Sequence, residues 1–546
     1  MAFHPSAHVD PFARDHLPPV DQWPVLNLTG AYDYPSRLNV AVRLLDDAVR
    51  EGHGARTAIL APDGAGWRTI SYAELQRWTD AVAHVLTDEL GLVPGHRVLL
   101  RGFNGPWMAA TWLAVLKAGM VAVTTMPMLR ATELRVVMQK SRCNAALCDA
   151  RLLDELSAAL ADAPTIASVR TWGGDAPDRL DLALARPARA FAACPTASDD
   201  VCLIAFTSGT TGVPKGCMHF HRDVMAMCDG FAAQVLRAGA DDRCIGTPPF
   251  AFTFGLGGLL CFPMAARAST VLLEKATPES LLQSIAATNA TITWTAPTMY
   301  RAMALAMQGA SGAFDTSSLR QCVSAGEALP DATRTLWRDA TGVEMLDGMG
   351  ATELIHIFIG ASGADVRHGA IGKAVPGYEV AVLDDALAPL PSGEVGRLGV
   401  RGPTGCRYLS DDRQLTYVQG GWNLTGDACT MDADGYVFFK ARTDDLIISS
   451  GYNIGAPEVE AAVLSHAAVA ECAVVGVPDA DRGQAVKAFV VLKPGQSGDD
   501  ALARALQEHV KATIAPYKCP RHVEFVLALP KTDTGKLQRF RLKEPA

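Results

Sequence analysis

The stretch TSGTTGVPKG, from Thr207 to Gly216, decides the fold, and it directly follows the apolar run VCLIAF. It holds four hydroxyl side chains, three glycines and Lys215 within ten residues. Glycines let consecutive backbone N–H groups approach an anion closely, while hydroxyls add donors and the lysine adds a positive charge. A loop of this composition after a buried strand predicts a binding site for a polyphosphate.

The spacing of this loop differs from that of the common nucleotide-binding P-loop. That motif needs GxxxxGK followed by Ser or Thr, whereas Lys215 is followed by Gly216 and is separated from Gly212 by only two residues. The alternative is a polar surface loop rich in Gly and Thr. Ten consecutive residues after an apolar strand favour the phosphate site.

Composition sets the class of protein. The 546 residues exceed one ordinary hydrophobic core, so we expect two or more domains. The formal net charge of -9, with acids and bases interspersed, argues against nucleic-acid or anionic-membrane partners. The 13 cysteines form no CxxC pair or zinc spacing, which predicts reduced, mostly buried thiols in a cytoplasmic protein. The first residues lack a signal-peptide pattern.

Helical patterns alternate with short β-branched runs over the first four hundred residues, which predicts α/β layers with largely parallel sheets. One helical pattern, from Ser71 to Leu90, opens with a serine and has a glutamate three residues on, which predicts a capping box. The apolar stretch from Trp107 to Leu129 contains Lys117, so it predicts a helix, a glycine turn and a buried strand rather than a membrane span. Short strands with tight turns from Leu383 predict a β-rich subdomain. The expected division is a large domain at 1–441, a hinge at 442–444 and a small mobile α+β domain at 445–546.

The loop resembles the phosphate loop of the adenylate-forming superfamily, which contains acyl-CoA synthetases, luciferases and peptide-synthetase adenylation domains. Further motifs follow in the family's order. Each alone has a plain structural interpretation: Glu353 as a solvated helix acid, Asp427 as a turn residue and Lys536 as one charge of a basic tail. Six motifs in order over almost the whole chain identify it as a member. The later five are SAGEAL, GMGATE, LTGDAC, ARTDDLIISSGYNIGAPEVE and PKTDTGKLQR.

The resemblance implies ATP, Mg²⁺ and coenzyme A as cofactor and co-substrates, and it implies a role for each matching residue. Thr352 would contact the α-phosphate, Glu353 would hold Mg²⁺, and Lys536 would be the catalytic lysine. Mg²⁺ on a nucleotide usually takes only one or two protein carboxylates. The implied ATP-binding residues are Thr207, Ser208, Gly209, Thr210, Thr211, Gly212, Lys215, Ser324, Ala325, Gly326, Glu327, Asp347, Gly348, Met349, Gly350, Asp427 and Arg442.

The resemblance also implies two half-reactions. ATP converts a carboxylate to an acyl-adenylate and releases pyrophosphate, and a thiol then displaces AMP. The small domain would rotate about Asp444 between the two steps, a hinge motion that completes each catalytic arrangement in turn. Gly451 and Tyr452 would then line the channel for the pantetheine thiol.

The acid is predicted to be aromatic. Phe250, Phe252 and Phe254 alternate before a flexible glycine run, as if one face offered aromatic surface to a pocket, although such a stripe is more often plain core. His356 follows Glu353 by three residues, so on a helix its ring could reach the pocket floor; a structural histidine is the equal alternative. The expected aryl pocket consists of Phe252, Thr253, Phe254, Gly255, Ala325, Gly350 and His356.

FAFTFGLGG, SAGEALP and DGMGATELIHIF resemble the ligases that make CoA thioesters of benzoate and 2-aminobenzoate, and SSGYNIG favours the 2-aminobenzoate group. Three positions depart from the family pattern. Met349 replaces the usual aromatic residue beside adenine, Ala441 replaces a glycine, and Ile448 stands where many relatives have lysine. Thiolation would then depend on other groups.

Three alternatives remain open at this stage. The enzyme could load an aryl acid onto a carrier protein's phosphopantetheine in trans, because the chain contains no fused carrier domain. It could be an inactive nucleotide-binding relative, although Lys215, Glu353, Asp427 and Lys536 are all present. A luciferase-like oxygenase shares the first half-reaction. We expect a cytoplasmic monomer or homodimer whose partners are an aromatic acid, ATP and CoA, with no nucleic acid and no membrane.

Overall fold

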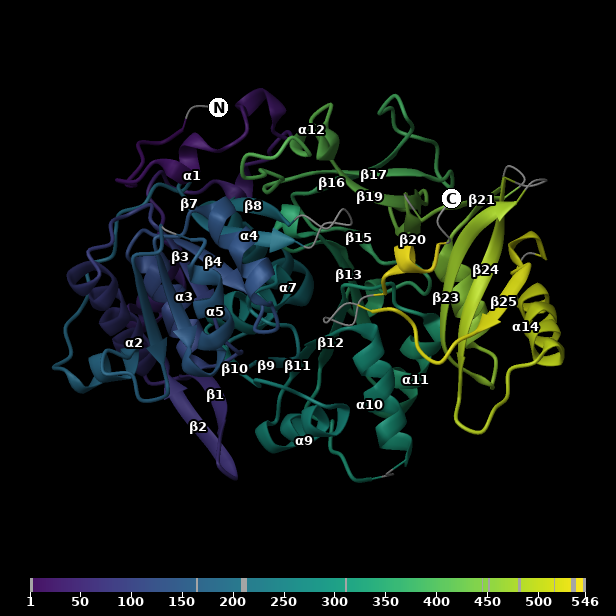
Figure 1. Cartoon of the computed structure of the whole chain (residues 1–546), viewed down its shortest axis with the longest axis horizontal. Coiled ribbons are helices and arrows are strands. Elements are labelled where there is room, and N and C mark those ends of the chain that lie inside the picture. The colour runs from purple at the N-terminus through teal and green to yellow at the C-terminus, as the bar shows by residue number, and fades with distance from the viewer. Residues whose placement is uncertain are drawn as a thin grey trace.

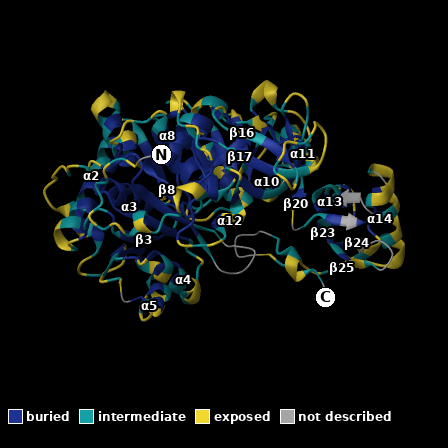
Figure 2. Ribbon diagram, turned by 90° about the horizontal axis from the view of Figure 1, so that it is seen from above, coloured by how far each residue is buried: buried dark blue, intermediate teal, exposed yellow. Residues whose placement is uncertain are grey.

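The computed structural model describes residues 3–163, 165–207, 214–309, 312–443, 445–449, 452–479, 483–514, 516–531 and 537–543. Figure 1 shows two large sheets and their helices forming the main body, with the last hundred residues gathered at one side. Figure 2, seen from above, shows buried residues through the interior of the main body and exposed residues mostly at its periphery. No helix in these ranges is long and apolar enough to cross a membrane.

The first sheet carries the strand that leads into the phosphate loop. Its six strands run in the order β6-β5-β3-β4-β7-β8, all parallel except the last pair. Helices α3 (Pro106–Lys117), α4 (Ala131–Ser141) and α5 (Leu153–Leu160) connect successive parallel strands. The strands are β3 (Arg97–Arg101), β4 (Val121–Thr125), β5 (Ala145–Asp149), β6 (Ser168–Trp172), β7 (Val201–Thr207) and β8 (Lys215–Phe220).

The stretch from Trp107 to Leu129 folds as its sequence predicts. Helix α3 ends at Lys117, Gly119 turns with φ of 75°, and β4 is buried throughout. Lys117 is itself buried, and its ammonium donates to Asp46 at 2.7 Å and Asp80 at 2.6 Å. The charge that interrupts the apolar run is therefore neutralised inside the first domain core.

The second sheet has nine strands in the order β15-β14-β13-β12-β11-β9-β10-β1-β2, parallel from β13 to β1 and antiparallel at both edges. Its strands are β1 (Thr57–Asp63), β2 (Gly66–Ser71), β9 (Arg243–Gly246), β10 (Ser269–Val271), β11 (Ile292–Thr295), β12 (Gln321–Ala325), β13 (Met345–Gly350), β14 (Ile357–Gly360) and β15 (Lys373–Ala374). Among its helices are α2 (Tyr72–His84), α9 (Pro278–Thr288), α10 (Pro297–Gly309) and α11 (Asp331–Thr341).

Helix α2 begins at the predicted cap. The Ser71 hydroxyl accepts from the backbone N–H of Glu74 at 3.1 Å, which satisfies one of the free donors at the helix start. The Glu74 side chain bonds Arg68 instead of returning to Ser71, so only half of the expected capping box forms.

A third, five-stranded sheet is the predicted β-rich subdomain. It contains β16 (Glu379–Leu383), β17 (Gly396–Arg401), β18 (Val418–Gln419), β19 (Trp422–Met431) and β20 (Val437–Arg442), all antiparallel. Between β17 and β18, residues 407–409 run beside β8 of the first sheet and bond to it at Gly216 and Met218. The subdomain is thereby tied to the strand that follows the phosphate loop.

The last sheet is built entirely from residues after 446. Helices α13 (Ala456–Leu464) and α14 (Asp500–Thr513) pack with it around a separate apolar core. Its strands are β21 (Ile447–Ser449), β22 (Tyr452–Ile454), β23 (Val469–Asp479), β24 (Gly483–Leu492) and β25 (His522–Phe525). The α/β class with a β-rich subdomain and a small α+β unit is confirmed. All 13 cysteines are free thiols, and all but Cys194 are buried.

Candidate active site

The phosphate loop is held between two paired strands. Strands β7 and β8 form an antiparallel hairpin in which Thr207 lies opposite Lys215. Lys215 is the first residue of β8, so strand pairing fixes its backbone and its side chain leaves the sheet at the mouth of the loop. The predicted residues Ser208, Gly209, Thr210, Thr211 and Gly212 lie outside the described residues.

The hydroxyl of Tyr408 forms hydrogen bonds with both Lys215 and Glu353. The Lys215 ammonium donates to the Tyr408 oxygen at 2.7 Å, and the Tyr408 hydroxyl donates to Glu353 Oε1 at 2.5 Å. The ammonium is also 3.4 Å from that carboxylate oxygen. Glu353 is 8 % exposed and Tyr408 1 % exposed. The structure thus brings the two predicted nucleotide-binding charges into one buried polar cluster, which we call the charged cluster: Lys215, Glu353 and Tyr408.

Tyr408 was not predicted as a site residue. It lies in the segment that pairs with β8, where Met218 donates to the carbonyl of Arg407 and Leu409 donates to that of Gly216. Beside it, the fully buried Arg407 guanidinium pairs with Asp223 at 2.7 Å. The sequence GCRYLS carries no motif that would reveal this, because the contact depends on how the third sheet meets the first.

Strands β12 and β13 place the predicted adenine-contacting residues side by side. In their parallel register Ser324 lies opposite Asp347, and Ala325 lies opposite Gly348. Burial raises the pKa of the Asp347 carboxyl to about 7. Gly326 follows β12 with φ of 91°, a conformation that favours glycine and turns the chain at the strand end. Glu327 follows that turn, and Met349 and Gly350 end β13.

Asp427 and Arg442 lie opposite each other on β19 and β20. The Arg442 guanidinium donates to Asp427 Oδ1 at 2.9 Å and to the carbonyl of Thr425 at 2.8 Å. Burial, followed by the negative charge of Glu353, raises the pKa of Tyr417, and the charge of Asp427 acts in the same direction. The two predicted ribose contacts therefore pair with each other in this structure.

His356 sits in an apolar environment. Its ring centroid lies within 4.5 to 6.1 Å of four aromatic rings, with Phe262 the nearest. Of these four, the sequence predicted only Phe254. For the other three rings the sequence predicted no role in the site. We call the group the aromatic cluster: Phe231, Phe254, Phe262, Trp294 and His356.

Burial keeps the His356 imidazole neutral. It is 3 % exposed, and desolvation lowers its pKa to about 3. Nε2 lies 3.4 Å from the carbonyl oxygen of Phe254, while Nδ1 is fully buried and has no partner among the described residues. A neutral ring that directs its N–H at Phe254 presents Nδ1 as a hydrogen-bond acceptor.

The backbone between Glu353 and His356 does not continue as the helix that would place both on one face. Residues Thr352–Leu354 form a single 3₁₀ turn, and Ile355 adopts φ of 67° and ψ of -35°. A β-branched residue rarely takes a positive φ, at a cost of about 1 to 3 kcal/mol. This turn sends Glu353 toward the charged cluster and His356 toward the aromatic cluster, so the two do not share a helical face.

The segment TPPFAFTFGLGG is also less of a loop than expected. Phe250 is buried in the main core, Phe252 caps helix α7 (Thr253–Leu256), and a helical turn of π type continues through Gly257–Cys261. A Cβ at Gly257 would lie 2.4 Å from His356 Cδ2, and one at Gly258 would lie 2.5 Å from Trp294 Cδ2. The glycine run therefore lets the rings of His356 and Trp294 pack directly against its backbone. The sequence pattern predicts a flexible run instead.

The remaining residues of the predicted aryl pocket lie on α7, β12 and β13. Thr253 and Gly255 are buried on α7, and Ala325 ends β12 at 6 % exposure. A Cβ at Gly350 would lie 2.8 Å from the carbonyl oxygen of His356, so this position admits only a glycine. Of the predicted moving parts, Asp444, Gly451 and Lys536 lie outside the described residues, and Tyr452 is the first residue of β22.

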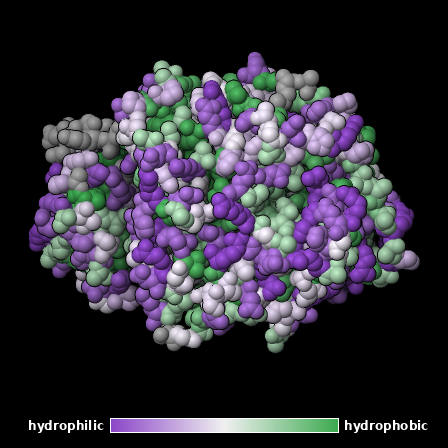
Figure 3. All heavy atoms as spheres, turned by 180° about the vertical axis from the view of Figure 1, so that it is seen from behind, coloured by the Kyte–Doolittle hydropathy of each residue, from purple (hydrophilic) through white to green (hydrophobic). Residues whose placement is uncertain are grey.

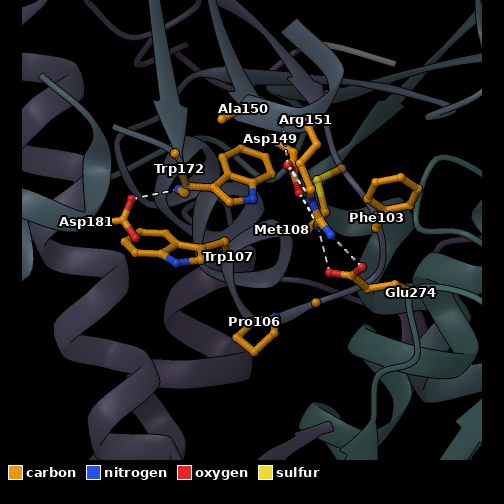
Figure 4. A pocket seen from close by; sticks show the side chains of 13 residues that line it. Phe103, Pro106, Trp107, Met108, Asp149, Ala150, Arg151, Trp172, Asp181 and Glu274 are labelled. Atoms are coloured by element: carbon orange, nitrogen blue, oxygen red, sulfur yellow. Dashed lines mark hydrogen bonds and ion pairs between the residues drawn. The ribbon is translucent and has the colours of Figure 1, made fainter. Parts of the chain in front are cut away.

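A separate cleft of about 340 Å³ opens at the carboxyl ends of β3, β5 and β6 (Figure 4). On one wall, Arg151 forms paired hydrogen bonds with Asp149 and with Glu274. Trp107 and Trp172 form another wall. Because both carboxylates already engage the guanidinium, the cleft offers no free cation to a triphosphate, and it contains none of the predicted site residues.

The surface beyond these sites is mixed. Figure 3 shows hydrophilic and hydrophobic residues interspersed over the face that it displays. This agrees with the interspersed acids and bases of the sequence.

Comparison with known proteins matches the chain to two family models. The model described as AMP-binding enzyme covers residues 45–408, and the model described as AMP-binding enzyme C-terminal domain covers residues 458–536. A benzoate–CoA ligase of Thauera aromatica is 35% identical over 521 residues, covering 95% of this chain and 98% of that protein. A 4-hydroxybenzoate–CoA/benzoate–CoA ligase of Rhodopseudomonas palustris is 33% identical, over 93% of this chain and 94% of that protein.

Solved structures give the same picture. An anthranilate CoA ligase in complex with anthranoyl-AMP superposes with a TM-score of 0.87 at 34% identity, covering 94% of this chain and 98% of that one. A benzoate CoA ligase from Burkholderia xenovorans LB400 superposes with a TM-score of 0.82 at 30% identity, covering 93% and 100%.

Proposed function

The chain belongs to the AMP-binding enzyme family, and on that premise we propose that it is an ATP-dependent aryl-CoA ligase. It would join an aromatic carboxylic acid to coenzyme A through an aryl-adenylate, with release of pyrophosphate and then AMP. The observation that carries the proposal is the placement of the charged cluster and the aromatic cluster on either side of one backbone turn. Relatives named as benzoate and anthranilate ligases support it.

The first half-reaction needs positive charge, because it brings a carboxylate against a triphosphate. Lys215 would bind phosphate, Asp427 and Arg442 would hold the ribose side, and Thr352 would contact the α-phosphate. Glu353 fits Mg²⁺ that arrives on the nucleotide, because its Oε2 has no partner among the described residues. That part of the chain contains no cluster of three or more metal-ligating side chains. The ion would supply further positive charge at the phosphates.

The second half-reaction requires a different arrangement. We propose that the chain divides into a large domain at 1–441, a hinge at 442–444 with Asp444 as its pivot, and a small domain at 445–546. Closing would bring Lys536 to the adenylation site, and rotation would then replace it with the channel beside Gly451 and Tyr452. The separate core of the last sheet, with α13 and α14, supports the idea that it can move as a unit.

We propose 2-aminobenzoate as the preferred acid, with benzoate next. A flat ring suits an aromatic wall, because stacked and edge-on aromatic pairs gain about 0.5 to 1.5 kcal/mol beyond their burial. An ortho amine needs an acceptor, and His356 Nδ1 is a buried acceptor without a partner in the described chain. Ser324 Oγ is a second buried atom in the same condition, on β12.

The test is pyrophosphate release with ATP and Mg²⁺ against benzoate, 2-aminobenzoate, hydroxybenzoates, phenylacetate, cinnamate and octanoate, each with and without CoA. We expect CoA-dependent turnover to concentrate on 2-aminobenzoate and benzoate. Activity confined to octanoate would overturn the aromatic pocket. Acylation of carrier proteins in preference to CoA would identify the acceptor as a phosphopantetheine arm, and release of no pyrophosphate with any acid would overturn the proposal.

A further inference from the structure

The charged cluster contains one residue to which neither the motifs nor the proposed function gives a task. Tyr408 is almost completely buried, yet its hydroxyl lies between two groups of opposite charge. Its single proton points at Glu353 Oε1, and its lone pair accepts from Lys215. A phenol in this position links the ammonium to the carboxylate and fixes the direction in which each of them points.

The neighbouring structure holds Tyr408 rigidly. Its backbone N–H donates to Gln414 Oε1 at 3.0 Å, and the Gln414 amide donates to carbonyls of Gln22 and Cys406. Its ring meets Tyr417 edge-on at 5.8 Å. The Lys215 ammonium lies 4.8 Å from the Tyr408 ring centroid and 5.8 Å from that of Tyr417. The hydroxyl therefore stays in place when its charged partners move.

Lys215 and Glu353 differ in exposure and in how many of their polar atoms have partners. Lys215 has 19 % of its side chain exposed and only the hydroxyl and the carboxylate as polar partners among the described residues. Glu353 uses only Oε1, and its Oε2 has no partner in that part of the chain. In this structure the lysine supplies the positive charge that Glu353 needs in a buried place.

We propose that Tyr408 is a positioning residue for the metal–nucleotide complex: it keeps Oε1 of Glu353 engaged so that Oε2 faces Mg²⁺, while Lys215 stands in for that cation until MgATP arrives. Binding then exchanges partners. Glu353 would exchange the ammonium for the metal ion, and Lys215 would exchange the carboxylate for phosphate. The inference deepens the proposed function and rests on its assignment of Lys215 and Glu353.

The exchange predicts that metal and nucleotide bind together more tightly than either binds alone. Mg²⁺ without nucleotide has to displace Lys215 from a buried carboxylate, and ATP without metal leaves Glu353 facing phosphate. Tyr408 contributes to the joint event, because it holds the carboxylate in the orientation that the metal needs.

Tyr417 provides a matched control. It is a half-buried tyrosine against Tyr408, and its buried hydroxyl has no hydrogen-bond partner within the described residues. Tyr417→Phe and Tyr408→Phe each delete one buried hydroxyl from adjoining rings. Only the second removes hydrogen bonds to charged groups.

The experiment is calorimetric titration of the full chain with ATP, with and without Mg²⁺ and with no acid present. We expect Tyr408→Phe to raise the Kd of MgATP at least about tenfold, as for loss of a hydrogen bond to a charged group. Metal-free ATP should weaken much less, and Tyr417→Phe should stay within about twofold of wild type in both titrations. In a Glu353→Gln background, Tyr408→Phe should add less than about twofold.

Wild-type affinity for MgATP in Tyr408→Phe would overturn the inference and leave the proposed function standing. A full tenfold loss in the Glu353→Gln background would also overturn it, because the tyrosine would then act only through packing. If the wild type does not bind MgATP, the proposed function and the inference both fail. Circular dichroism checks folding. Should Tyr408→Phe not fold, 3-fluorotyrosine at position 408 keeps the hydroxyl as a stronger donor; we expect MgATP to bind more tightly, and weaker binding would contradict the inference.

Discussion

The charged cluster and the aromatic cluster each contain one residue of the same short segment, Glu353 and His356, which are three residues apart. The surroundings of these two residues differ in charge, polarity and hydrogen bonding. Glu353 is buried with an ammonium and a hydroxyl, whereas His356 is buried among rings and stays neutral. The Glu353 side chain has one oxygen engaged, and the His356 ring has one nitrogen without a partner. Ile355 separates them by a backbone conformation that β-branched residues rarely adopt.

The difference shows how one short segment can serve two kinds of ligand. A carboxylate buried beside hydrocarbon would lose its charge, and an imidazole beside a lysine and a carboxylate would become part of their network. Turning the chain once keeps each group in the environment that its chemistry needs. The proposal assigns the charged side to the nucleotide and the apolar side to the acid.

The largest expected effect comes from a substitution that changes the charged cluster and leaves the aromatic cluster intact. Glu353→Gln keeps the shape of the side chain but removes the charge, so we expect kcat/KM for adenylate formation to fall about 100- to 1,000-fold, as when one preorganised group that stabilises the transition state is lost. The fall should be the same for every acid, leaving the ratio of 2-aminobenzoate to benzoate unchanged. Pyrophosphate-exchange rates measure it, and a changed ratio would show that the two clusters are not independent.

A smaller effect should appear on the aromatic side. His356→Leu fills the space without an acceptor, and we expect kcat/KM for 2-aminobenzoate relative to benzoate to fall about 10- to 100-fold, because the amine is left without its hydrogen bond. The Kd of MgATP should not change. His356→Asn, which returns an acceptor oxygen near the place of Nδ1, should recover part of the ratio; equal losses for both acids in all variants would contradict the role given to Nδ1.

The last expected effect is on stability, and it develops gradually and only at acid pH. Burial holds the pKa of His356 and of His221 at about 3, below the ordinary value near 6.5. Above pH 6.5 both folded and unfolded histidines are neutral. As the pH falls from 6.5 toward 3, only the unfolded chain takes up these protons, so the free energy of unfolding falls by up to about 1.4 kcal/mol per pH unit for each histidine.

Urea titrations of wild type and His356→Leu between pH 6.5 and 4 test this. The unfolding free energy of the variant should fall less steeply with decreasing pH, by up to about 1.4 kcal/mol per pH unit, which is the slope due to one proton. The other titrating groups are shared by both proteins. Parallel curves would mean that His356 is charged or exposed in the folded state.

Much of the fold was predictable because local patterns agree with the final structure. The predicted cap at Ser71, the glycine turn at Gly119 and the strand before Thr207 all formed where the residue types required them. The resemblance to adenylate-forming enzymes is likewise confirmed by the family match and the aryl-CoA ligase relatives. The roles of individual residues in the site stay predictions.

The rest depended on contacts between distant segments. Tyr408 reaches Lys215 only because a segment of the third sheet pairs with β8, nearly two hundred residues earlier in the chain. Trp294 and Phe262 were hidden in ordinary strand and helix patterns, because periodicity reports burial and not which core a ring joins. The helical condition under which Glu353 and His356 would share a face is not met, because Ile355 adopts a positive φ that its own propensity opposes.

The glycine pair at 257 and 258 has a consequence for how such a protein can change over generations. Neither residue has a side chain to offer an acid, yet each sets how far a ring of the aromatic cluster can advance. Under the proposed function, a substitution at either glycine would change the space behind the rings and leave the residues assigned to the nucleotide unchanged. Over generations, substitutions at these two positions would change which acids fit, while the reaction with ATP stays the same.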